Sequence, residues 1–336
     1  MPYISGATEG FRGSATPKDL EYALQMLYAY FTDLNYDPEA FEGYKQKQSN
    51  LFENMISQPN FYFQQEFYAF LNKENPRWNG LVPNNEKWAS TNYQLAYNKF
   101  KERFSNAADF EFFFVGNVDE SVIENLAKKY IASLPSTNSK ETPKDLGYRM
   151  IKGDLKKVVN KGKDPKSNVT IMYYGETNYD SNEAYLLKAV GDILTIKLTE
   201  VIREQESGVY TVNARGSMNK VPYSSYNFTI SFPCGPENTE KLITASLAEL
   251  NKIIANGPTQ VDLDKFKQAE ILDYKKQIKE NRYWMSNFIR SFNNSSNPED
   301  ILEVEAKINA VTLAQVQEVA KKYLSKDKII GVLMPE

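Results

Sequence analysis

The chain has 336 residues, of which 41% are hydrophobic and 25% are charged, a balance typical of a globular protein with buried cores. At roughly 100–200 residues per domain, this length predicts two domains. The 40 basic and 43 acidic residues give a net charge of −3, which lacks the basic footprint of a nucleic-acid-binding protein and excludes nucleic acid as a partner.

The sequence contains no histidine and a single cysteine, Cys234. Imidazole is the commonest metal ligand and the usual side chain that titrates near neutral pH. A catalytic zinc site would therefore need carboxylates alone, which is not how such sites are built. Catalysis by Ser-His-Asp or Cys-His groups is excluded as well. We expect no metal or other cofactor in this chain, and no internal disulfide bond.

The sequence shows neither a membrane span nor an export signal. No stretch of 18 apolar residues is present, so no membrane span is expected. Residues 1–6 lack the basic start and apolar stretch of a signal peptide, and any leader of a parent protein would lie outside this chain. A single cysteine leaves the compartment open, because many exported proteins also lack disulfides.

The first part of the chain is predicted to be mainly helical. Pro17 suits the first position of a helix that runs to about Leu34, with apolar residues at helical spacing. Further helices are expected from about residue 37, at 60–72, at 91–104 and at 119–133. The aromatic run from Phe110 to Asn117 ends in turn residues and predicts a buried strand.

The second part of the chain is predicted to mix strands and helices. Strands are expected at 158–160, 167–175, 209–216, 226–232 and 328–333. Helices are expected at 182–205, 238–255, 262–280, 281–292 and 313–323. The linker-like stretch Leu134 to Ser139 separates the two parts. We therefore predict an α+β fold with one domain at residues 1–137 and a second at 138–336.

The order of elements in the two parts suggests an internal duplication. In each, a helix and a short link precede a similar segment, so that residues 44–46 align with 266–268. The first copy has its opening strand at Tyr3 to Gly6 and lacks roughly 75–85 residues if the domains are equal in size. The alternative is two independent α+β domains whose helices share an order by coincidence.

A family resemblance rests on two segments. Residues 198–212 read as a helix end, an arginine, acidic residues, Gly-Val-Tyr and a strand, and this order resembles the fourth-domain signature of insulinase-like (pitrilysin-type) zinc metallopeptidases. Residues 113–118, followed by 130–135, resemble the end of the third domain of that family. The resemblance implies two related domains of the insulinase/processing-peptidase type, each an antiparallel-rich sheet packed with helices, with the first truncated at its N-terminus.

The same resemblance implies a function for the parent protein. In this family, four similar domains form two halves that close around a chamber, and the first domain holds zinc on an inverted H-x-x-E-H motif. That motif is absent from this chain. The chain would therefore be the zinc-free C-terminal half, unable to cleave peptides by itself. Its partners would be the zinc-bearing N-terminal catalytic half, or a partner chain, and a peptide substrate. The family expectation for the compartment is export, to the bacterial periplasm.

The resemblance also assigns substrate-binding roles to Arg203 and Tyr210. In the family, the matching side chains reach across the chamber to the substrate. A guanidinium and a phenol can donate hydrogen bonds to the oxygen of a peptide carbonyl under attack. The alternative for Arg203 is that it satisfies carbonyls at a helix end, and Tyr210 can be read as an ordinary strand aromatic.

Two other functions compete with this one. The first is a non-catalytic scaffold, like the family-related core subunits of respiratory complexes or the inactive partner of processing peptidases. The second is a solitary peptide-binding module, which would have to fold stably with a truncated first domain and an apolar exposed sheet. The presence of Arg203 and Tyr210 favours the peptidase half over the scaffold.

Overall fold

The computed structural model describes residues 1–137, 139–205 and 211–336, without the side chains of 203–205. Its internal contacts divide the chain into two compact units, which we name the helical unit and the sheet unit. The helical unit comprises Met1–Asn50, Asn85–Lys144 and Ile278–Ile301. The sheet unit comprises Leu51–Asn84, Asp145–Gln277 and Leu302–Glu336. The domain boundary after residue 137 stays a prediction.

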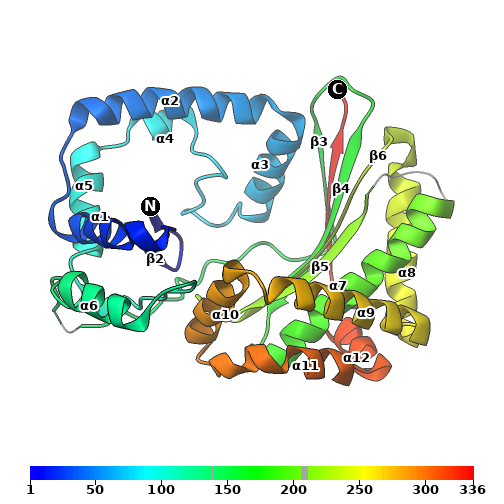
Figure 1. Cartoon of the computed structure of the whole chain (residues 1–336). Helices are drawn as coiled ribbons and strands as arrows, with labels where there is room; N and C mark the ends of the chain where they lie inside the picture. The colour runs from blue at the N-terminus through cyan, green and yellow to red at the C-terminus, as the bar shows by residue number, and fades with distance from the viewer. Residues whose placement is uncertain (138, 206–210) are drawn as a thin grey trace. The chain divides into compact units, whose positions relative to one another are not determined.

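The helical unit contains most of the elements expected in the first part of the chain (Figure 1). Its helices are α1 (Leu20–Thr32), the first part of α2 (Pro38–Ser57), α4 (Asn85–Ala89), α5 (Tyr93–Arg103), α6 (Glu120–Tyr130) and α10 (Asn281–Asn294). Its strands β1 (Pro2–Ile4) and β2 (Glu9–Phe11) form an antiparallel pair. Helix α4 was not predicted, because five residues are too few to show a helical period.

The core of the helical unit is a cluster of aromatic rings. Phe11 of β2 packs against Phe31 of α1, Phe104 and Phe110, with ring centroids 4.8–6.5 Å apart. Phe104 is almost completely buried at 1% exposure, and Leu24 of α1 is buried as well. Ring stacking and edge-to-face contacts therefore provide much of the cohesion of this unit.

The predicted strand at Phe110 to Asn117 is wrong. The segment has no regular secondary structure, and it pairs with no strand of the described residues. Phe110 instead contributes its ring to the aromatic core, while Phe114 is 39% exposed. A strand is stabilised by hydrogen bonds to a neighbour, so an aromatic run without a pairing partner stays irregular.

The sheet unit is built on a five-stranded mixed sheet in the order β3-β7-β4-β6-β5. The strands are β3 (Leu155–Asn160), β4 (Ser167–Glu176), β5 (Asn213–Asn219), β6 (Ser225–Cys234) and β7 (Ile329–Met334). Strands β3 and β7 are parallel, and the other neighbours are antiparallel. These strands lie within a few residues of their predicted positions, and the α+β class is confirmed. The expected start of β5 at residues 209 and 210 lies outside the described residues.

Both faces of this sheet are covered. Helices α7 (Ser181–Leu198), α8 (Thr239–Asn256) and α12 (Leu313–Leu324) pack on one face, and α9 (Gln260–Gln277) packs on α7. Helix α3 (Pro59–Leu71) covers β3 and β7 on the other face. Alternate residues of β4 follow this division, because Ile171 and Tyr173 enter the core under α7 while Met172 packs beneath α3.

Two helices of the sheet unit differ from the sequence prediction. Helix α11 (Val304–Ala310) was not predicted, since it covers only two turns. The helix expected at 182–205 is α-helical to Leu198 and continues as the π-helix η3 (Thr199–Gln205). Among the described residues, no helix is both long enough and apolar enough to cross a membrane.

Candidate functional site

The connection between α7 and β5 holds both predicted substrate-binding residues. The backbone of Arg203 belongs to η3, but its side chain is not described. Tyr210 lies outside the described residues altogether. The expectation that the two side chains face one space therefore stays a prediction. A π-helical segment is uncommon in proteins and is frequent at functional sites, so η3 is the candidate functional element of this connection.

Helix α7 approaches β5 closely, and two glycines permit this. A Cβ atom on Gly191 of α7 would lie 2.9 Å from the carbonyl oxygen of Ala214, and one on Gly216 of β5 would lie 2.3 Å from that of Leu187. Thr195 joins the two elements, because its Oγ1 accepts a hydrogen bond from the Ala214 N–H at 2.8 Å. The end of α7 is thus fixed against the strand that follows the connection.

The start of η3 is anchored in the core of the sheet unit. Ile202, next to Arg203, is fully buried among the residues under α7, α8 and α12. The hydroxyl of Thr199 donates to the carbonyl oxygen of Thr195 at 2.8 Å, which ties the first turn of η3 to α7. Arg203 therefore follows directly on a residue whose position is fixed by packing.

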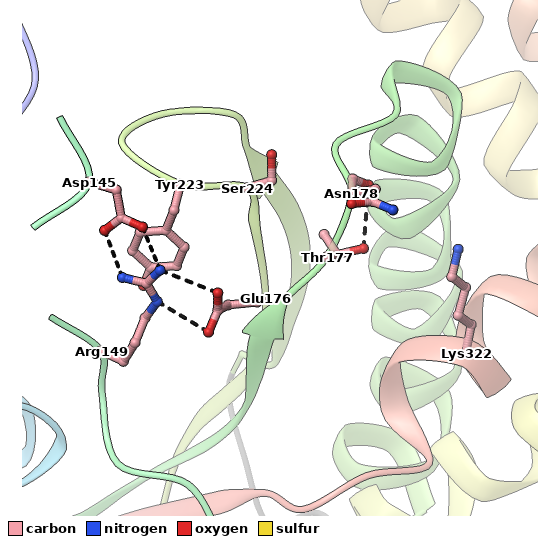
Figure 2. A pocket seen from close by; sticks show the side chains of 8 residues that line it. All are labelled: Asp145, Arg149, Glu176, Thr177, Asn178, Tyr223, Ser224 and Lys322. Carbon is pink, nitrogen blue, oxygen red and sulfur yellow. Dashed lines mark hydrogen bonds and ion pairs between the residues drawn. The ribbon is translucent and has the colours of Figure 1, made fainter. Parts of the chain in front are cut away.

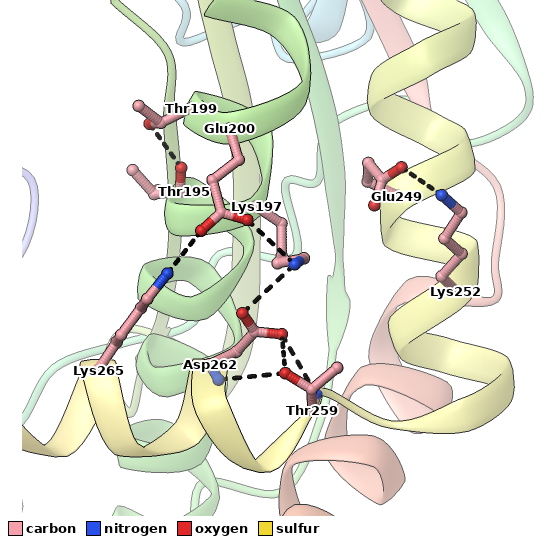
Figure 3. A network of polar contacts seen from close by, with 9 residues as sticks. All are labelled: Thr195, Lys197, Thr199, Glu200, Glu249, Lys252, Thr259, Asp262 and Lys265. Carbon is pink, nitrogen blue, oxygen red and sulfur yellow. Dashed lines mark hydrogen bonds and ion pairs between the residues drawn. The ribbon is translucent and has the colours of Figure 1, made fainter. Parts of the chain in front are cut away.

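A network of charges surrounds the same turn (Figure 3). The Glu200 carboxylate lies 2.7 Å from Nζ of Lys265 on α9 and 3.1 Å from Nζ of Lys197 on α7. Hydrogen bonds from Lys265 and Lys197 lower the pKa of Glu200. Burial acts to lower the pKa of Lys197, but its pairs with Glu200 and Asp262 outweigh this, so its pKa is raised. Glu200 and Lys197 are therefore both charged at neutral pH.

The network continues to a buried carboxylate at the start of α9. Asp262 is 2% exposed and lies 3.4 Å from Nζ of Lys197. It also accepts hydrogen bonds from the hydroxyl of Thr259 at 2.6 Å and from its N–H at 3.3 Å. A buried carboxylate requires such partners to offset its desolvation. The pairs from Glu200 to Asp262 therefore connect η3 to the interior of the sheet unit.

The sheet unit also has an open pocket of about 540 Å³ at the end of β4 (Figure 2). It is lined by Asp145, Arg149, Glu176, Thr177, Asn178, Tyr223, Ser224 and Lys322. The Arg149 guanidinium pairs with Asp145 at 2.7 Å and Glu176 at 3.2 Å, and it stacks 3.6 Å from the ring centroid of Tyr223. Sequence reasoning missed this pocket, because its residues come from four separate segments.

The contacts of Arg149 indicate a structural role for the residues that line this pocket. Hydrogen bonds from Arg149 lower the pKa of Asp145 to about 2, so both partners stay charged near neutral pH. The guanidinium has carboxylates on two sides and an aromatic ring on one face. Its main interactions are therefore with other residues of this chain. We interpret the cluster as a clasp that fastens residues 145–149 to β4 and to the loop before β6.

The donors available in this chain do not fit a zinc site. Among the described residues, no group of three or more Cys, Asp or Glu side chains is placed to hold a metal ion. The thiol of Cys234 is buried beside Thr239, and burial raises its pKa, which disfavours the thiolate that metals bind. The prediction that this chain holds no metal stays a prediction.

Comparison with known proteins extends the resemblance found in the sequence. A curated relative from Haemophilus influenzae, described as a probable zinc protease PqqL, is 24% identical over 98% of this chain and 35% of the relative. This chain thus spans about a third of that relative's length. The crystal structure of the periplasmic protease PqqL from Escherichia coli is similar with a TM-score of 0.79 at 21% identity, over 96% of this chain and 36% of that one.

Two further comparisons bear on the inactive half of this family. The crystal structure of a peptidase M16 inactive domain from Pseudomonas fluorescens is similar with a TM-score of 0.75 at 16% identity, over 95% of this chain and 76% of that one. The family described as the peptidase M16 inactive domain matches residues 96–270, more than half of this chain. That match includes η3 and both predicted substrate-binding positions. The resemblance to insulinase-like metallopeptidases is confirmed, and the chain belongs to the peptidase M16 inactive domain family.

Proposed function

We propose that this chain is the zinc-free C-terminal half of an insulinase-like metallopeptidase and helps to enclose a peptide substrate. The observation that carries the proposal is the inactive-domain match over residues 96–270. The length of the Haemophilus influenzae relative supports it, because a match to 35% of that protein leaves room there for a catalytic half. The donor set of this chain does not fit zinc, so we assign the zinc and the H-x-x-E-H motif to the other half.

The contribution of this half to catalysis would come from Arg203 and Tyr210. Attack on a peptide bond develops negative charge on the carbonyl oxygen, and zinc on the other half would supply the activated water. The guanidinium of Arg203 and the hydroxyl of Tyr210 are donors suited to that oxygen. The anchoring of η3 by Ile202 and Thr199 supports this role, since donors stabilise developing charge best when they are held in place beforehand.

The partners and the compartment follow from the same proposal. The chain would pair with the catalytic half of its own parent protein or with a separate catalytic chain, and the two would bind a peptide between them. The related Escherichia coli protein is described as a periplasmic protease, and this supports export of the parent protein.

The test is a kinetic comparison in the full-length parent protein. Arg203→Ala and Tyr210→Phe should each lower kcat by about 10²–10³, the usual effect of losing one such donor, with zinc content unchanged. The control is Arg77→Ala, which removes an exposed guanidinium from a loop of the same unit and should leave kcat unchanged. Normal turnover in both test variants would contradict the proposal and favour the non-catalytic scaffold.

A further inference from the structure

Glu200 links the turn before Arg203 to neighbouring helices through ion pairs. Glu200, in the first turn of η3, reaches Lys197 on α7 with one carboxylate oxygen and Lys265 on α9 with the other. A carboxylate held at both oxygens has little rotational freedom, so it fixes the backbone from which it extends. Figure 3 shows Glu200 between the two lysines, with Asp262 beyond Lys197.

The surroundings of this bridge make it stronger than an ordinary surface ion pair. The side chains of Lys197, Glu200 and Lys265 are 26%, 33% and 50% exposed, and the side chain of Asp262, which pairs with Lys197, is almost fully buried. Fully exposed pairs contribute little to stability, whereas partly desolvated and networked charges contribute more. The bridge therefore restrains η3 at a point three residues before Arg203.

A π-helical turn also needs such a restraint. This geometry is rare because it competes with the more stable α-helix, so a seven-residue π segment requires support from its tertiary contacts. Ile202 supplies packing from inside the unit, and Thr199 supplies a hydrogen bond to α7. Glu200 supplies the link to α9 through Lys265, a contact that spans 65 positions of the sequence.

We propose that Glu200, through its bridge from Lys197 to Lys265, is a positioning residue that holds η3 and the backbone of Arg203 in the orientation used against a peptide substrate. The inference rests on the proposed function for its catalytic part. Its structural part, that Glu200 restrains η3, can be tested without an activity assay. Loss of the bridge would let the turn relax, and small displacements of a catalytic group reduce rates strongly.

The first experiment measures the order of η3 directly, by hydrogen exchange of the backbone amides of residues 199–205 in the 336-residue chain. Glu200→Gln keeps the size of the side chain and removes its charge, and it should speed exchange there by about threefold to tenfold. The matched control is Glu270→Gln, which breaks the 2.7 Å pair with Lys188 between the same two helices, away from η3. Exchange that is equal in both variants and in the wild type overturns the inference.

The second experiment measures kcat and KM separately in the full-length parent. Glu200→Gln and Lys265→Met should each lower kcat by about fivefold to tenfold with KM within about twofold, because orientation in the transition state is lost. Lys265→Arg, which retains the charge, should restore kcat. The Glu200→Gln/Lys265→Met double variant should be no slower than Glu200→Gln alone, since that substitution already removes the pair with Lys265.

The two experiments separate the failure of this inference from failure of the proposed function. Unchanged kcat in Glu200→Gln, while Arg203→Ala is slow, overturns the positioning role and leaves the proposed function in place. Unchanged kcat in both Arg203→Ala and Tyr210→Phe overturns the proposed function itself, and the positioning role in catalysis with it. Independent effects of Glu200→Gln and Lys265→Met that add in the double variant also overturn the bridge as the cause.

Discussion

The sheet unit and the helical unit are stabilised in different ways. The sheet unit has a core on each face of its sheet, with Phe228, Ile230 and Leu194 completely buried. Among the described residues, the buried hydrophobic side chains of the helical unit are Leu24, Phe104, Leu134 and Ile301. Its cohesion relies on aromatic contacts between partly exposed rings, such as the stack of Tyr36 on Tyr93 at 4.9 Å.

This difference predicts that the two units differ in rigidity. A unit with strand ladders and two cores can hold a segment rigidly, and η3, which carries the proposed substrate-binding residue Arg203, belongs to that unit. A unit with few buried aliphatic side chains is expected to open locally at lower free energy. The sheet unit is therefore expected to hold the proposed donors in place, and the helical unit is expected to unfold first.

The largest expected effect comes from truncating one core phenylalanine in each unit. Phe228→Ala in β6 and Phe104→Ala after α5 remove rings that are 0% and 1% exposed, and each should cost about 3–5 kcal/mol. Phe104→Ala should abolish hydrogen-exchange protection in α1 and α5 while β4 and β6 stay protected. Phe228→Ala should lower protection throughout the sheet unit. Equal loss of protection in both units for either variant would contradict a difference in stability between them.

Alanine substitution of one glycine in each unit should have a smaller effect on stability, with opposite signs in the two units. Gly216→Ala would place a Cβ 2.3 Å from a backbone oxygen of α7, and it should destabilise the sheet unit by about 1–3 kcal/mol in urea unfolding. Gly43→Ala, on an exposed position of α2 with nothing within 4 Å, should instead stabilise the helix by up to about 1 kcal/mol. A Gly216→Ala protein as stable as the wild type would contradict the close packing of α7 on β5.

The smallest effect concerns pH and the clasp at Arg149. The pKa of Asp145 is about 2 in the folded chain against 3.8 for the free side chain, because Arg149 hydrogen-bonds the carboxylate. Since the folded pKa is the lower one, the stabilisation is complete above about pH 4 and is lost as the pH falls from 4 to 2. Asp145→Asn should flatten the acid side of a stability profile measured by urea unfolding.

The control for that measurement is Asp164→Asn. Asp164 lies 3.7 Å from Lys166 in an exposed loop, with both side chains about 80% exposed. This variant should keep the slope of the wild-type profile between pH 4 and 2. An unaltered profile in Asp145→Asn would show that the clasp adds nothing to the stability of the sheet unit.

Local patterns in the sequence predicted the elements whose stability is local. Helix α8 and strands such as β4 and β6 were placed within a few residues, because their apolar periods are long. The segment Phe110 to Asn117 failed, since a strand depends on a distant partner that its own residues do not reveal. The change from α-helix to π-helix at Thr199 was also missed, because the spacing of apolar residues predicted one continuous helix.

The candidate site likewise contains residues that the sequence identified and contacts that it did not predict. Arg203 and Tyr210 were identified by their resemblance to a family signature, and no spacing or composition would have singled them out. The bridge from Glu200 to Lys265 and the clasp at Arg149 were missed, because each joins residues far apart in the sequence. Pairing of charges across a fold is set by tertiary structure, so sequence patterns alone do not predict it.

The central claim, that this chain is the zinc-free half of a peptidase, is tested most directly by measuring zinc and peptide cleavage together. Elemental analysis and a peptide-cleavage assay should be run on the purified 336-residue chain and on its full-length parent. We predict stoichiometric zinc and cleavage in the parent, and neither in the chain alone. Tightly bound stoichiometric zinc in the isolated chain, with cleavage that a chelator abolishes, would contradict the account.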